Sequence, residues 1–145
     1  NLCNHSSYQG QGAIELESII NPVVQDAYDC QFDDYNGLFE IDYLDIIKGI
    51  LNDLESRLPK SDISTKFHNT IGMITVKLIT KISDIYHIND IALSGGVFEN
   101  KYLLTYIINI TKNSYLKVYF NQQIPINDGG ISLGQLIIAD ALEGE

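Results

Sequence analysis

The chain has 145 residues, of which 45% are hydrophobic, so it is long enough and apolar enough to bury the core of one domain. Its formal net charge is -10 with nine Lys and Arg residues, which argues against a nucleic-acid partner because phosphate backbones are bound through basic side chains. The longest apolar runs, such as residues 136–139, are too short to cross a bilayer, and no secretion signal opens the chain. We therefore expect a single cytoplasmic lobe over residues 1–145, and the missing initial Met and abrupt start indicate a segment of a longer protein.

The first third of the sequence predicts a short helix, a hairpin and a second helix. A glycine-rich turn at 7–12 leads into a helix over 13–20, which ends at Asn21 because a residue before proline avoids helical geometry. Residues 29–33 and 38–41 flank Asn36-Gly37, whose positive φ angles suit a tight hairpin turn. Asp42 can cap the second helix, which ends before residue 59 and carries an apolar stripe of Leu44, Ile47, Leu51, Leu54 and Leu58.

The longest predicted element is a helix that begins near residues 61–62. Its apolar residues recur at intervals of three or four, which is typical of one face of an amphipathic helix; they are Ile63, Phe67, Ile71, Ile74, Leu78 and Ile82. The last third predicts a strand at 90–94, a helix around 103–108, a strand at 115–120 and a closing helix at 131–142. This order predicts parallel strands joined by a right-handed crossover. The expected fold class is therefore α/β and helix-rich.

Glycine-bearing turns precede three of the predicted helices, at residues 10–12, 94–97 and 127–130. Glycine lets the backbone approach a ligand closely, and helix N-termini offer N–H groups to anions. Ligands of open α/β sheets bind at the carboxyl ends of strands, where the second and third turns are expected. By themselves these turns indicate a nucleotide- or anion-binding lobe without visible catalytic machinery.

The polar residues near these turns favour structural roles when each is taken alone. Asp128 at a helix start is more often a cap than a metal ligand, and Asn100 fits a solvated polar residue in a first helical turn. Glu15 fits a surface charge. His68 lies one position off the apolar stripe, where a lone histidine is more often a satisfied core residue than a catalyst. Cys3 and Cys30 form no metal-ligand motif, and reduced thiols are favoured over a disulfide, which the sequence leaves open.

Four stretches in register resemble one known family. They read Ser-Tyr-Gln-Gly-Gln-Gly-Ala-Ile-Glu-Leu-Glu at 7–17, Lys-Phe-His-Asn-Thr at 66–70, Ala-Leu-Ser-Gly-Gly-Val-Phe-Glu-Asn-Lys at 92–101, and Ile-Pro-Ile-Asn-Asp-Gly-Gly-Ile-Ser-Leu-Gly-Gln at 124–135. In order and spacing they resemble the C-terminal part of the hydrogenase-maturation carbamoyltransferases of the HypF family. One departure is Gln9, which stands where that family commonly has glutamate.

The resemblance implies a fold and an activity. The fold is the second lobe of an actin-, Hsp70- or sugar-kinase-type ATPase (ribonuclease H-like), present here in part. The activity implied for the parent enzyme uses carbamoyl phosphate and ATP to make carbamoyl-adenylate. It then transfers the carbamoyl group to the C-terminal cysteine of a HypE-like acceptor protein, for the cyanide ligands of nickel–iron hydrogenase.

The resemblance also implies roles for individual residues. Gly10, Gln11 and Glu15 match the segment that approaches the ribose and adenine, where a carboxylate can accept hydrogen bonds from hydroxyls. The turn at Gly95 and Gly96 matches backbone that lies against the nucleotide, with Asn100 as a polar contact. Asp128 matches an aspartate that helps to hold a divalent metal of unstated identity beside phosphate. His68 is a tentative catalytic residue, because it matches the family's Phe-His-Asn motif.

The upstream parts implied by the resemblance, among them a metal-binding histidine pair and the adenylate-forming domain, are absent from these 145 residues. We therefore expect that this lobe alone does not catalyse carbamoyl transfer, and that it pairs with itself when alone. Two other functions fit the sequence: an O-carbamoyltransferase of natural-product biosynthesis, or a non-catalytic nucleotide-binding or interaction module. The tRNA threonylcarbamoyl-transferases match more distantly, because their last motif usually reads Asp-Asn-Gly.

Overall fold

The computed structural model describes residues 5–143 of the chain. Its elements are α1 (Gln11–Ser18), β1 (Gln31–Tyr35), β2 (Leu38–Asp42), α2 (Leu44–Glu55), α3 (Lys60–Tyr86), β3 (Asp90–Leu93), the 3₁₀ turn η1 (Gly96–Glu99), α4 (Lys101–Thr111), β4 (Lys117–Phe120), the 3₁₀ turn η2 (Asp128–Gly130) and α5 (Ile131–Glu143). The predicted α/β, helix-rich fold class is confirmed, and the elements expected from the sequence are all found within a few residues of their expected bounds.

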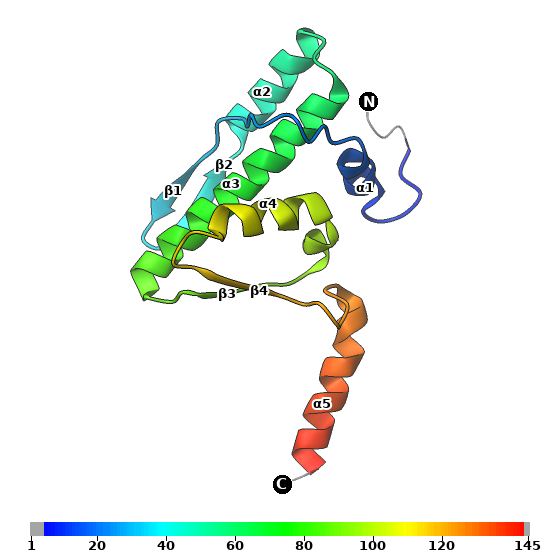
Figure 1. Ribbon diagram of the computed structural model, residues 1–145, viewed down its shortest axis with the longest axis vertical. Coiled ribbons are helices and arrows are strands. Elements are labelled where there is room, and N and C mark those ends of the chain that lie inside the picture. The colour runs from blue at the N-terminus through cyan, green and yellow to red at the C-terminus, as the bar shows by residue number, and fades with distance from the viewer. Residues whose placement is uncertain (1–4, 144–145) are drawn as a thin grey trace.

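The long helix α3 is the axis of the fold. It lies between α2 with the β1–β2 hairpin on one side and α4 with β3 and β4 on the other (Figure 1). One core cluster centres on Tyr28, Cys30, Ile46 and Ile74, and the other on Leu93, Leu103 and Ile107. Both clusters draw on the predicted apolar stripe of α3: Phe67, Ile74 and Leu78 pack into the first, and Ile71 into the second.

The hairpin turn forms as its sequence predicts. β1 and β2 pair antiparallel with Tyr35 opposite Leu38. Asn36 and Gly37 between them have φ angles of 56° and 89°, and the Gly37 amide donates to Oδ1 of Asp34 at 2.9 Å. A left-handed residue pair gives the turn the twist that the flanking strands need.

The apolar stripe predicted for α2 does not pack on the core, although the helix is found; its N-cap is Tyr43, and the predicted cap Asp42 lies one residue before it. The amide of Leu44 donates to Oδ1 of Asp42 at 2.8 Å, but α2 ends at Glu55 and leaves Leu58 outside it. The four remaining members of the stripe are between 45% and 53% exposed; they are Leu44, Ile47, Leu51 and Leu54. Instead α2 packs on the core through Ile46 and Ile50. The helix has two apolar faces, and the periodicity alone does not say which one meets α3.

The two C-terminal strands are parallel, as the element order predicts. Leu93 at the end of β3 lies opposite Phe120 at the end of β4, and α4 provides the crossover between them. Leu93, Ile91, Val118 and Phe120 pack inward on the second core cluster. Because parallel strands end at the same edge, the segments that follow β3 and β4 meet there, and the amide of Gly95 donates to the carbonyl of Ile126 at 3.0 Å.

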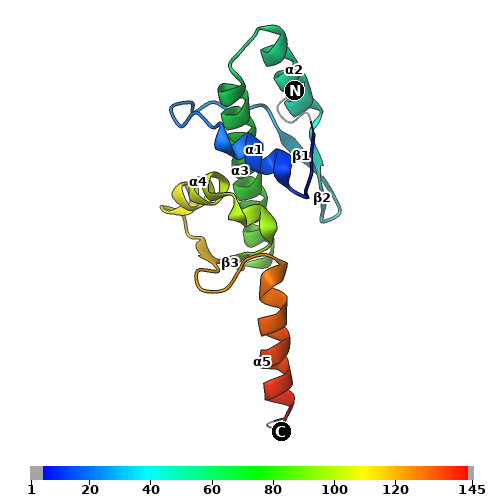
Figure 2. The same ribbon diagram turned by 90° about the vertical axis from the view of Figure 1, so that its right-hand side faces the viewer.

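The last helix, α5, extends away from the rest of the fold (Figure 2). Its apolar side chains are exposed, among them Leu136, Ile138 and Leu142. Within residues 5–143, no helix combines the length and the apolar character required to cross a membrane. Cys30 is a buried free thiol, whereas Cys3 lies outside the described residues.

Candidate functional site

The first predicted nucleotide-binding segment starts α1. Gly10 precedes the helix with a φ of 84°, a left-handed conformation that favours glycine. The side chain of Gln11 donates to Oε1 of Glu15 at 2.7 Å and accepts from the amide of Ser7 at 2.7 Å. The two predicted contacts Gln11 and Glu15 thus form one polar pair, which ties the glycine-rich turn to the helix.

The second segment follows β3. Gly95 has φ 104° and ψ 158°, a combination that is open only to glycine. A Cβ atom placed on Gly96 would lie 3.9 Å from Cβ of Asn127. Asn127 itself donates to Oε1 of Glu99 at 2.5 Å and accepts from the amide of Gly129 at 2.9 Å. The turns after β3 and β4 therefore lie against each other, as their predicted place at one sheet edge requires.

Asn100 lies at the start of α4 and contacts His68 in the middle of the fold. Oδ1 of Asn100 accepts from the amide of Leu103 at 2.8 Å, which makes Asn100 the N-cap of α4. Its Nδ2 lies 2.9 Å from Nε2 of His68. His68, which is 5% exposed, directs Nδ1 at the carbonyl oxygen of Ser64, 2.8 Å away.

These contacts determine the tautomer of His68. The carbonyl of Ser64 can only accept, so Nδ1 carries the hydrogen. The oxygen of the Asn100 side chain already accepts from Leu103, so its amide nitrogen faces the ring and Nε2 must be the acceptor. His68 is therefore a neutral imidazole with both nitrogens engaged.

Helix α1 is hydrogen-bonded to both helices that carry the His68–Asn100 contact. The hydroxyl of Ser64 donates to the carbonyl of Leu16 at 2.6 Å, and Oε1 of Glu17 accepts from the amide of Tyr102 at 3.3 Å. The three helices α1, α3 and α4 are thus joined by hydrogen bonds around His68. Among the predicted site residues, Asn100 contacts His68, and Gly96 lies against Asn127, the residue before Asp128. Glu15 is hydrogen-bonded to Gln11 instead.

The start of α4 is less open to an anion than the sequence suggests. Side chains of the protein already engage two of its first amides, because Glu17 accepts from Tyr102 and Asn100 accepts from Leu103. A helix N-terminus binds anions through such free amides. A ligand here would have to approach the glycine backbone at Gly95 and Gly96, where no atoms crowd the Gly95 Cβ position.

Asp128 begins η2 and is exposed. Among residues 5–143, no group of three His, Cys, Asp or Glu side chains is arranged to hold a metal ion. A hard divalent cation needs several oxygen ligands, so the described residues alone do not make a metal site, and other ligands would have to come from elsewhere. The two turns also carry the acidic side chains of Glu99 and Asp128, which would repel a phosphate unless another group neutralised it.

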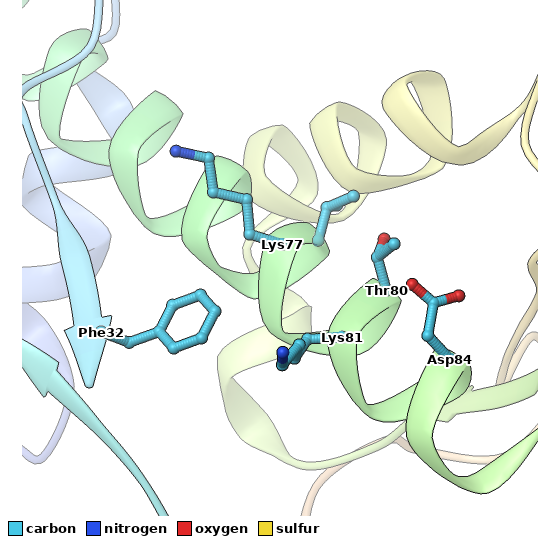
Figure 3. A pocket seen from close by; sticks show the side chains of 6 residues that line it. Phe32, Lys77, Thr80, Lys81 and Asp84 are labelled. Carbon is cyan, nitrogen blue, oxygen red and sulfur yellow. The ribbon is translucent and has the colours of Figure 1, made fainter. Parts of the chain in front are cut away.

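Two hollows in the surface differ in their relation to these residues. One, of about 390 Å³, lies between β1 and α3 and is lined by Phe32, Val76, Lys77, Thr80, Lys81 and Asp84 (Figure 3). None of these six residues belongs to the predicted site. The other, of about 320 Å³, lies between the strand ends and α5 and includes Ser94, Asn127 and Gly130. The second hollow is the one that coincides with the predicted nucleotide-binding turns.

Reasoning from the sequence missed several residues that build this region. Asn69 is fully buried; its Nδ2 donates to the carbonyl of Asp26 at 2.9 Å, and its Oδ1 accepts from the Tyr102 hydroxyl at 2.8 Å. Glu17 and Asn127 were also missed. The signal was present, because Glu17, Asn69 and Asn127 lie inside the quoted motifs at 7–17, 66–70 and 124–135. Which residue of each motif meets another element depends on packing.

Comparison with known proteins gives consistent matches along the chain. A family model described as "Carbamoyltransferase, Kae1-like Domain, second subdomain" matches residues 1–135. The carbamoyltransferase HypF of Synechocystis sp. is 34% identical over 137 residues, which cover 94% of this chain and 17% of that protein. The probable carbamoyltransferase HypF of Methanocaldococcus jannaschii is 28% identical over 137 residues, covering 92% of this chain and 17% of that protein.

Solved structures show the same relationship in three dimensions. A crystal structure of full-length HypF in the phosphate- and nucleotide-bound form superposes with a TM-score of 0.87 and 38% identity, covering 97% of this chain and 18% of that one. The T. kodakarensis HypF structure superposes with a TM-score of 0.75 at 21% identity, covering 99% and 18%, and supports the fold alone. The chain thus spans less than a fifth of the length of these relatives.

Proposed function

Because the chain belongs to the HypF carbamoyltransferase family, as the second subdomain of its Kae1-like domain, we propose that it forms the nucleotide-facing part of a complete carbamoyl-transfer site. The parent enzyme would use carbamoyl phosphate and ATP, by way of carbamoyl-adenylate, to carbamoylate the C-terminal cysteine of a HypE-like acceptor in the cytoplasm. The predicted site residues and the whole-protein activity belong to this proposal.

The observation that carries the proposal is the likeness to one solved structure. The match has a TM-score of 0.87 and 38% identity and covers 97% of this chain, and the family model spans residues 1–135, which include all three glycine turns. That relative is a nucleotide-bound form, and the turns after β3 and β4 in this chain meet around a hollow at the strand ends. Ligands of α/β sheets bind at this edge.

The residues of this chain would bind and orient the nucleotide rather than react with it. Gly95 and Gly96 would let the backbone lie against the nucleotide. The Asn100 carboxamide would make a polar contact with the nucleotide. Glu15, held by Gln11 at 2.7 Å, would accept hydrogen bonds from ribose hydroxyls. Asp128 would contribute one ligand to a metal, with the other ligands supplied by the rest of the enzyme.

In the transfer step, the acceptor thiolate would attack the carbamoyl carbon. A carbon–sulfur bond would form while the bond from that carbon to the adenylate oxygen breaks, and the electron pair would leave with the AMP phosphate. His68 offers no free ring nitrogen as a base, since both of its nitrogens are engaged by the protein. We therefore expect that the chain alone does not turn over carbamoyl phosphate.

Thermal unfolding in the presence of ATP tests the nucleotide-binding part of this proposal. At ten times its Kd, a ligand that binds only the folded state adds about 1.4 kcal/mol of stability, which raises the Tm by a few degrees. Asn100→Ala and Glu15→Ala should remove most of this shift. The matched control Glu55→Ala, at the exposed end of α2, should keep it. An unchanged Tm at millimolar ATP would contradict the proposal for this chain.

A further inference from the structure

We infer that His68 is a positioning residue, which orients the Asn100 carboxamide for the nucleotide, and is not a catalytic residue; the inference rests on the proposed function. His68 is 5% exposed, and its two ring nitrogens contact the Ser64 carbonyl at 2.8 Å and the Asn100 amide at 2.9 Å. A general acid or base must have a nitrogen within reach of the substrate proton. Here both nitrogens bind the protein itself.

The contact acts on Asn100 because the two ends of a carboxamide have nearly the same shape and differ in hydrogen bonding. The acceptor Nε2 of His68 holds the amide nitrogen on one side, so the oxygen is directed at the amide of Leu103, 2.8 Å away. Without an acceptor at position 68, the Leu103 amide alone would hold the carboxamide, and its nitrogen end would no longer be fixed. The orientation of Asn100 thus depends on two contacts, one with the Leu103 amide and one with the His68 ring.

The imidazole is itself firmly held, which a positioning residue requires. The rings of Phe67 and Tyr102 each meet it edge-on at a centroid distance of 5.9 Å. The residue that receives its Nδ1 hydrogen, Ser64, donates in turn to the Leu16 carbonyl of α1 at 2.6 Å. His68 therefore connects the two nucleotide-binding segments of the proposal, α1 and the turn that leads into α4.

A pair of substitutions at position 68 separates orientation from packing. His68→Leu removes the acceptor and keeps an apolar side chain, whereas His68→Gln keeps an amide oxygen that can accept from Asn100. ATP binding is measured by titration calorimetry. We expect His68→Leu to weaken ATP binding about tenfold, equivalent to about 1.4 kcal/mol, and His68→Gln to recover most of the loss. In an Asn100→Ala background, His68→Leu should have almost no further effect, because coupled residues are not additive.

Ser83→Ala is the matched control. Ser83 is also a buried polar residue of α3, 2% exposed, and its hydroxyl donates to Oδ1 of Asn89 at 3.1 Å near the C-terminal end of α3. Its loss should lower the free energy of unfolding to a similar degree as His68→Leu, with an unchanged Kd for ATP. The control thereby distinguishes weaker ATP binding caused by a less stable fold from weaker ATP binding caused by a misoriented Asn100.

The possible results are distinguishable. If the unaltered chain binds ATP and His68→Leu binds it equally well, if His68→Gln binds it as weakly as His68→Leu, or if the effects of His68→Leu and Asn100→Ala simply add, the positioning role is overturned while the proposed function stands. Should His68→Leu fail to fold by circular dichroism, His68→Phe, which also lacks a hydrogen-bond acceptor, replaces it in the cycle with Asn100→Ala. A nitrogen NMR spectrum with hydrogen on Nε2 also overturns the inference. No ATP binding by the unaltered chain overturns the proposed function instead.

Discussion

The hydroxyl of Tyr102 donates a hydrogen bond of 2.8 Å to Oδ1 of Asn69, which joins α4 to α3 beside His68. Asn69 is fully buried, and its Nδ2 is used by the Asp26 carbonyl at 2.9 Å. The Tyr102 ring stacks on Tyr106, with centroids 6.2 Å apart. The packing of α4 on α3 therefore depends on a polar contact as well as on the apolar core.

Removing that hydroxyl should destabilise the chain. Tyr102→Phe leaves Oδ1 of Asn69 buried without this donor, and an unsatisfied buried acceptor costs about 1–3 kcal/mol. Urea unfolding followed by circular dichroism measures the change. The control is Tyr119→Phe, because Tyr119 is 55% exposed and its hydroxyl contacts Asp90 at the surface; it should change stability by less than about 0.5 kcal/mol. Equal effects of the two variants would mean that the buried contact contributes nothing.

Gly72 should not tolerate alanine. A Cβ atom at this position would overlap the ring of Tyr106, which packs on α3 there. Alanine favours a helix by about 1 kcal/mol over glycine, but overpacking a core costs about 1–3 kcal/mol, so we expect a net loss of stability or a shift of α4. Gly134→Ala on α5, where no atom lies within 4 Å, should gain stability. A Gly72→Ala variant more stable than the parent would contradict this packing.

The free energy of unfolding should depend on pH in part through the carboxyl group of Asp53. Burial raises the pKa of its carboxyl, but hydrogen bonds from Lys66 and Tyr28 outweigh burial, and the pKa lies below its ordinary value of 3.8. The folded chain therefore binds this proton less readily than the unfolded chain. The stability that Asp53 contributes is present at neutral pH and is lost as the pH falls through about 4 and below.

Unfolding free energies at pH 7 and pH 3 test this assignment. Asp53→Asn should be less stable than the parent at pH 7 and should lose less on acidification. Asp45→Asn is the control, because Asp45 pairs with Lys48 on the surface at 3.0 Å with both side chains more than half exposed, and such pairs contribute little. If Asp53→Asn loses as much unfolding free energy between pH 7 and pH 3 as the parent chain, the contact with Lys66 is not maintained in solution.

The exposed apolar surface of α5 should cause the chain alone to self-associate. Leu136, Ile138 and Leu142 are 62–69% exposed, and exposed apolar surface of this kind marks contact sites. We expect light scattering after size exclusion to give a mass above that of one chain. Leu136→Glu should restore the monomer, whereas Val23→Glu, at an 82% exposed position away from α5, should not. A monomeric parent chain would rule out pairing through α5.

Much of the secondary structure could be predicted because its signals are local. The stripe of α3, except for Ile82, which is 39% exposed, and the Asn36-Gly37 turn depend on residues close in sequence, and both are found. The parallel pairing of the last two strands follows from the order of the elements and is also found. The stripe of α2 was predicted on the wrong face, because Ile46 and Ile50 form a second apolar face and only contact with α3 selects between the two.

The candidate site divides in the same way. The glycine turns and the motif that contains His68 stand out in the sequence, since glycine conformations and family motifs are properties of short segments. The contact between His68 and Asn100 joins residues 32 positions apart, and the engagement of Tyr102 by Glu17 joins residues 85 apart. These pairings, and hence the role of each polar side chain, follow from how the helices pack. The sequence by itself determined the elements, the fold class and the family; only the tertiary structure decided which side chains meet, because hydrogen-bond partners distant in the chain are selected by packing.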